Sequence, residues 1–183
     1  TGVASPASTA TEVPGETAVP TPGLPPLADP ASLADISQQA GWTVLAPTWV
    51  PDGYSYSDLY YDQNNQMVIL TYLATRSLPG SEDLTQTHSL TVVEALHNDV
   101  VPLEVAPGTS VEQVPVNGQM GAYVVGAWDS QYDSASETMV ATWRSDLAVQ
   151  NVFWQRGPVY LVVITDDDQV SKADLIQTAS SVP

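Results

Sequence analysis

Short runs of β-branched and aromatic residues recur between residues 42 and 165 and are separated by Gly, Pro, Asn and Asp. Such runs are typical of strands, because branched and aromatic side chains fit a pleated, half-buried surface. The pattern predicts nine strands, at residues 42–46, 54–61, 67–74, 88–96, 111–116, 120–128, 138–143, 149–154 and 159–165.

The links between these runs are short and carry turn residues. Asn117-Gly118 fits a two-residue hairpin turn, and Asn64-Asn65 and Arg156-Gly157 also tolerate positive φ. No helical pattern separates consecutive runs, whereas parallel strands need a crossover of about a dozen residues. We therefore expect a curved antiparallel sheet of the meander type.

A helical pattern stands at each end of the strand region. Residues 30–40 place apolar side chains on one stripe, with Asp29 or Ser32 as the cap and Gly41 as the end. A second helix, from Ser171 to residue 182, opens with a capping box and carries one apolar face. The predicted fold class is α+β, with a short N-terminal helix and a C-terminal helix packed on one face of the sheet.

Residues 1–27 contain repeated Pro among Ala, Ser, Thr and Gly, and they contain no aromatic residue. Such a segment buries too little apolar surface to offset the entropy of ordering. We interpret it as a flexible tether, with a floppy terminus as the alternative, and residues 28–183 as a single domain.

The charge is strongly negative, with 21 acidic residues against four basic ones and a net charge of -17. Nucleic acids and anionic lipid headgroups attract clustered Lys and Arg, so the composition excludes both as partners. No Cys is present, and no apolar run reaches the roughly 18 residues of a membrane span. The chain begins at Thr1, so we expect membrane contact only through an anchor that has been removed upstream.

Four local patterns occur in order along the chain: Pro47-Thr48-Trp49-Val50-Pro51-Asp52-Gly53-Tyr54, Val116-Asn117-Gly118, Trp154-Gln155-Arg156-Gly157-Pro158-Val159-Tyr160 and Leu175-Ile176-Gln177-Thr178-Ala179-Ser180-Ser181. Together they resemble the domain of unknown function found outside the membrane in predicted anti-sigma factors and related bacterial envelope proteins. The resemblance covers roughly residues 30 to 182. It implies a place after a membrane helix and a sensing or scaffolding role, but no chemistry, because the shared residues are turn and core residues.

Candidate catalytic groups are few. Asp58, Asp62 and Glu94 could supply a pair of carboxyl groups of the glycosidase type, although chance pairs are expected among 21 acidic residues. No G-x-S-x-G motif occurs. We therefore expect a protein that is not an enzyme and needs no cofactor.

Metal binding has little support in the pattern. His88 and His97 have opposite parity along one predicted strand and point to different faces, so they cannot share a metal ion. Asp166, Asp167 and Asp168 are weak calcium candidates. The alternative interpretation of this trio is a solvated turn that favours the start of the following helix.

Aromatic residues are the more informative set, since a sheet with one uncovered face can use them to line an apolar groove. Most rings should be core. The candidates for ligand binding are Trp49, Tyr54, Tyr56, Tyr60, Tyr61 and Trp128.

Two functions follow from these patterns. The first is a non-enzymatic, extracytoplasmic sensory or binding domain of a membrane-anchored regulatory protein, similar to an anti-sigma factor, with an unknown ligand or protein partner outside the membrane. The alternative is a secreted or lipoprotein-type carrier that binds a lipid, peptide or glycan in a groove of the sheet. The sequence upstream of Thr1 would distinguish them.

Overall fold

A computed structural model describes residues 28–183 except 79, 82, 97–104 and 135–136. The predicted tether, residues 1–27, and His97 lie outside the described residues. In chain order the elements are α1 (Pro30–Ala40), β1 (Ser55–Asp62), β2 (Met67–Ser77), β3 (Thr85–Ala95), β4 (Glu112–Val116), β5 (Gln119–Val125), β6 (Ala127–Asp133), β7 (Thr138–Arg144), β8 (Gln150–Arg156), β9 (Val159–Thr165) and α2 (Lys172–Ser180).

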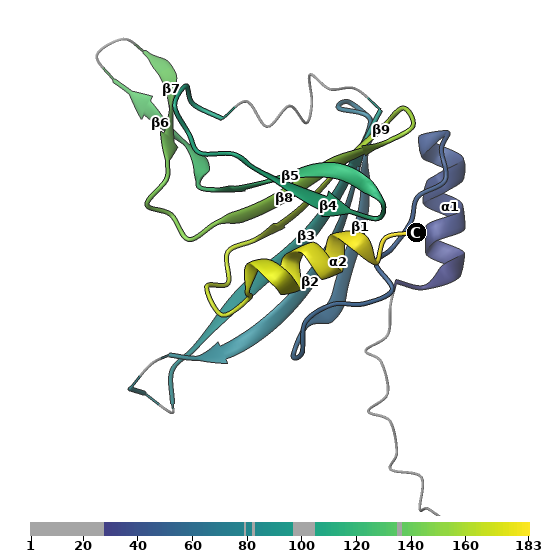
Figure 1. The fold of residues 1–183 in the computed structure, drawn as a ribbon, viewed down its shortest axis with the longest axis horizontal. Helices are drawn as coiled ribbons and strands as arrows, with labels where there is room; N and C mark the ends of the chain where they lie inside the picture. The colour runs from purple at the N-terminus through teal and green to yellow at the C-terminus, as the bar shows by residue number, and fades with distance from the viewer. Residues whose placement is uncertain (1–27, 79, 82, 97–104, 135–136) are drawn as a thin grey trace, which may run out of the picture.

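Seven strands form one antiparallel sheet in the order β1-β2-β3-β9-β8-β5-β4, and β6 and β7 form a separate two-stranded sheet (Figure 1). The predicted α+β class is confirmed. Neighbours in sequence pair from β1 to β3, as in a meander, but β9 then takes the place beside β3. This central position suits β9, because its side chains are buried on both faces of the sheet.

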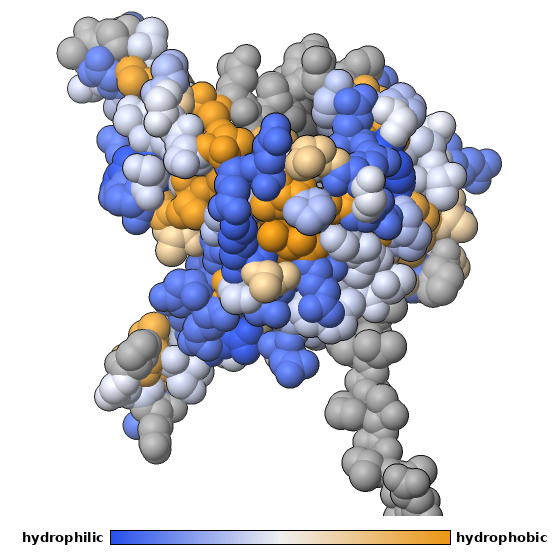
Figure 2. All heavy atoms as spheres, in the orientation of Figure 1, coloured by the Kyte–Doolittle hydropathy of each residue, from blue (hydrophilic) through white to orange (hydrophobic). Residues whose placement is uncertain are grey.

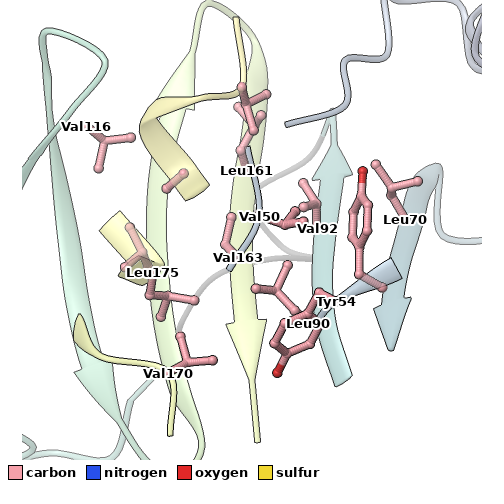
Figure 3. Close-up of a cluster of buried hydrophobic side chains, with 14 of the residues drawn as sticks. Val50, Tyr54, Leu70, Leu90, Val92, Val116, Leu161, Val163, Val170 and Leu175 are labelled. Atoms are coloured by element: carbon pink, nitrogen blue, oxygen red, sulfur yellow. The ribbon is translucent and has the colours of Figure 1, made fainter. Parts of the chain in front are cut away.

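Both helices lie on the same face of the large sheet. α1 contacts β1 and β2, and α2 contacts β4, β8 and β9. The core fills the space between this face and α2, and Leu175 of the helix belongs to the same buried cluster as Leu161, Val163 and Leu90 of the strands (Figure 3). Burial of such side chains contributes roughly 1.5–3 kcal/mol each, so this layer holds the domain together.

The capping predictions are confirmed at three helix ends. Asp29, rather than Ser32, is the N-cap of α1, and Gly41 ends that helix with φ 83°. The Ser171 side chain accepts a hydrogen bond from the backbone N–H of Asp174, whose carboxylate accepts one from the N–H of Ser171. α2 ends at Ser180, slightly before the predicted end.

Two strand predictions are wrong. Residues 42–46 form no strand, because the N–H of Val44 donates to Ser37 Oγ and the N–H of Leu45 donates to the Glu94 carboxylate. The predicted strand 120–128 is two strands divided at Gly126, whose φ of 124° breaks the extended path. No helix among the described residues is long and apolar enough to cross a membrane.

Candidate ligand-binding face of the sheet

The face of the large sheet opposite the helices carries a continuous apolar row. In β2 and β3 the even-numbered side chains, such as Leu70 and Val92, point into the core, so the odd-numbered ones point away from it. Strand register then aligns neighbouring side chains on this helix-free face. We call this set the cross-sheet row: Tyr60, Ile69, Val93, Val162, Phe153 and Ala122.

The row is half-buried over most of its length. Val162, at its centre on β9, is only 2% exposed, whereas Tyr60 on the edge strand β1 is 54% exposed. No described helix covers these residues. An apolar strip of this kind on a sheet face marks a place where another apolar group can bind.

At the β4 end the row opens into a hollow of about 550 Å³. Its apolar walls include Val111, Met120, Phe153 and Tyr160, and Met120 is 66% exposed. Its polar side chains include the amides of Gln113 and Gln155, and none of the described residues that line it is charged. Ligand sites of about 300–1,000 Å³ with apolar walls and a few polar groups are typical of small-molecule binding.

The structure does not gather the six predicted aromatic residues into one groove. Tyr60 lies on the helix-free face, but Tyr54 is part of the core, where its hydroxyl donates to Asp167 Oδ2 over 3.1 Å. Burial raises the pKa of Tyr54 to about 12. Tyr54 is therefore a structural residue.

The other aromatic candidates also have structural neighbours. Tyr56 meets Tyr72 edge to face with ring centroids 6.2 Å apart, and Tyr61 meets Trp42 in the same way at 6.1 Å. The remaining two are Trp49, which is half-buried and whose backbone N–H donates to Ser181 Oγ, and Trp128, which lies on the separate hairpin β6–β7. Sequence reasoning missed Met120, Phe153 and Tyr160, although the alternation within β8 and β9 carries the signal for the last two.

The candidate carboxyl pair is not assembled. Glu94 is 1% exposed and points to the helix side, where Arg156 Nη2 lies 3.6 Å from its Oε2. Asp58 and Asp62 belong to the edge strand β1, and Asp62 is occupied by hydrogen bonds from Asn65 that lower its pKa. These three residues therefore do not share a cleft.

The acidic trio after β9 also separates. The Asp167 side chain is fully buried and pairs with Arg76, whose Nε lies 3.1 Å away. Asp166 accepts a hydrogen bond from the N–H of Ser89 at 2.7 Å and lies 3.7 Å from His88 Nδ1, while Asp168 is exposed. Within the described ranges, no group of three or more His, Asp or Glu side chains is placed to hold a metal ion.

All four basic side chains of the chain are engaged in ion pairs. The carboxylates outnumber them by 17, so the field outside the protein is negative. The pairs are Arg76–Asp167, Arg144 with Asp129 and Asp146, Arg156–Glu94 and Lys172–Glu112.

Comparisons of the chain with models of protein families, with curated proteins and with solved structures found no match.

Proposed function

We propose that this chain is a non-enzymatic, extracytoplasmic binding domain that holds a small apolar ligand on the helix-free face of its sheet. The observation that carries the proposal is the cross-sheet row, which continues into the hollow beside β4. Among the described residues neither helix contacts the strands from this side, although alternate side chains of each strand point to it.

The lining of the hollow indicates the chemistry of the ligand. Val111, Met120 and Phe153 offer apolar contact, and Gln113 and Gln155 offer neutral hydrogen-bond donors and acceptors. The negative field disfavours an anionic ligand. The ligand that fits best is therefore an uncharged apolar molecule with one polar end.

The cellular role that we propose is sensing, in a membrane-anchored regulatory protein similar to an anti-sigma factor, with residues 1–27 as the tether. A carrier role is the second candidate, because the hollow has the volume of a single small molecule and opens at the surface. In both roles the ligand occupies the same face.

The test compares two large apolar side chains of similar exposure, Met120 at 66% in the hollow and Leu84 at 58% just before β3. Nile red, a neutral apolar fluorophore, is titrated into the full chain and into the Met120→Glu and Leu84→Glu variants. A charge in an apolar site costs far more than a charge on an open surface. We expect Met120→Glu to weaken dye binding about tenfold or more and Leu84→Glu to leave it unchanged.

Failure of the full chain to bind the dye would overturn the proposal. Equal effects of the two substitutions would do the same, because the dye would then respond to net charge alone. Thermal unfolding of each variant shows that both are folded.

A further inference from the structure

The hairpin β6–β7 has one apolar and one polar face. Its register pairs Trp128 with Trp143 and Tyr132 with Met139, and the only other pair on that face is Ser130 with Ala141. The opposite face carries Asp129, Gln131, Asp133, Thr142 and Arg144 among others. We call the side chains of Trp128, Tyr132, Met139 and Trp143 the hairpin surface.

The hairpin surface is exposed although it is apolar. Tyr132 is 63% exposed, Met139 64% and Trp128 46%. The hairpin forms a sheet of its own and projects from the body of the domain, at the upper left of Figures 1 and 2. An exposed cluster of large apolar side chains, rimmed by polar ones, is typical of an interaction site.

The base of the hairpin is held firmly, so the surface has a defined position. Arg144 donates from Nε and Nη2 to both carboxylate oxygens of Asp146, at 2.7 and 2.6 Å. The N–H of Gly126 donates to the carbonyl of Val149, and the side chain of Asn151 donates to the carbonyl of Gly126. Two-stranded hairpins are marginally stable by themselves, so the hydrogen bonds that join Gly126 to Val149 and Asn151 support the hairpin where it leaves the large sheet.

A hollow of about 530 Å³ lies at the same base. It is lined by Trp143, Tyr123, Val125 and the loop at residues 106–110. Because Tyr123 pairs in register with the core residue Val152, this hollow lies on the helix side of the sheet. The hairpin surface and the hollow adjoin at Trp143, which belongs to both.

Charge decides which partner suits this region. Residues 127–146 include four acidic residues, Asp129, Asp133, Glu137 and Asp146, but only one basic residue, Arg144. Arg144 is already engaged by Asp129 and Asp146. Anionic membranes and a second copy of this acidic chain would both be repelled.

We infer that the hairpin surface and the hollow at its base dock a basic, partly apolar polypeptide segment of another protein. Apolar side chains of the partner would contact Trp128, Tyr132 and Met139, and its Lys or Arg side chains would be attracted by the negative field of the acidic hairpin and of the chain as a whole. Tyr and Trp are the residue types that dominate such contacts, since they bury large rigid areas.

The experiment measures binding of synthetic peptides to the full chain by calorimetry. The probe alternates Lys with Leu, and the control peptide has Glu in place of every Lys. The protein variants are the double substitution Tyr132→Ser with Met139→Ser and, as the matched control, Met120→Ser on the helix-free face. All three positions are more than half exposed, so the variants are expected to fold, which thermal unfolding checks.

We expect the Lys/Leu peptide to bind, the hairpin variant to weaken binding about tenfold or more, and Met120→Ser to leave it unchanged. The inference is wrong if the hairpin variant binds the probe as tightly as the unmodified chain. It is equally wrong if the Glu/Leu peptide binds as well, if vesicles with one quarter phosphatidylglycerol bind through the hairpin, or if sedimentation shows a dimer that the hairpin variant abolishes.

Discussion

Replacing Glu94 by alanine should strongly destabilise the domain, because this buried carboxylate holds the segment between α1 and β1. Its Oε2 accepts from Trp42 Nε1 at 3.1 Å, and its Oε1 accepts from the N–H of Leu45 at 3.0 Å. Arg156 lies close enough to form an ion pair, at 3.6 Å. Burial raises the pKa of Glu94, and these donors oppose burial without cancelling it.

The size of the effect follows from what the substitution leaves behind. Removing one member of a buried ion pair costs about 3–5 kcal/mol, and each buried N–H without an acceptor costs about 1–3 kcal/mol. The two costs overlap in Glu94→Ala, so we expect a loss of about 4 kcal/mol in the free energy of unfolding. In a domain of this size 1 kcal/mol corresponds to about 2–4 °C, and Tm should fall by roughly 8–16 °C.

Urea and thermal unfolding, followed by circular dichroism, measure this loss. Glu94→Gln keeps one acceptor oxygen and removes the buried charge, so it should cost about half as much. The control is Glu112→Ala, which breaks the exposed pair with Lys172 and should cost less than about 1 kcal/mol. A loss for Glu94→Ala as small as that of the control would refute the reasoning.

Three further predictions concern other features of the fold. Gly126→Ala should cost about 2 kcal/mol more in urea unfolding than Gly118→Ala: both residues have positive φ, but only at Gly126 would a Cβ lie 2.8 Å from the Trp143 ring. Burial favours a higher pKa for Asp167, but its hydrogen bonds outweigh burial and lower the pKa. The charged Asp167 therefore stabilises the fold, and this contribution is lost as pH falls below about 4. Asp167→Asn should make the acid limb of a pH–Tm curve less steep. Ser171→Ala should lower stability by about 1 kcal/mol in the same urea assay, through loss of the α2 cap.

The helices could be predicted to within a few residues because their end signals are local. The Asp29 side chain accepts hydrogen bonds from N–H groups in the adjacent first turn of α1. Ser171 and Asp174 exchange hydrogen bonds within one turn. No distant residue takes part in these contacts. The sequence pattern and the structure therefore agree at the helix ends.

The partners of the strands could not be predicted in the same way, because they come from distant parts of the chain. The run at residues 42–46 has the composition of a strand, yet the N–H of Leu45 is satisfied by a carboxylate 49 positions away. Likewise β9 joins β3 although five strands separate them in sequence. A single sequence shows which runs are apolar, but not which other strand each run will pair with.

The candidate site shows the same limit for aromatic residues. Sequence reasoning selected Tyr54 and passed over Phe153, yet the structure places Tyr54 in the helix-side core and Phe153 in the lining of the hollow on the helix-free face. Which face a strand residue such as Phe153 occupies depends on the register of its strand with its neighbours, and a single sequence does not give that register.

The two proposed sites have a consequence for each other, since they lie on opposite faces of the large sheet. Met120 and Phe153 line the hollow on the helix-free face, while Trp143 and Tyr123 line the hollow on the helix side. Strand β5 contributes to both through alternate residues, so the backbone of the sheet separates the two ligands. Nile red and the Lys/Leu peptide should therefore bind at the same time, and saturation with the dye should not prevent the peptide from binding. If the dye and the peptide exclude each other in that titration, they share one surface, because ligands on opposite faces of the sheet cannot contact each other.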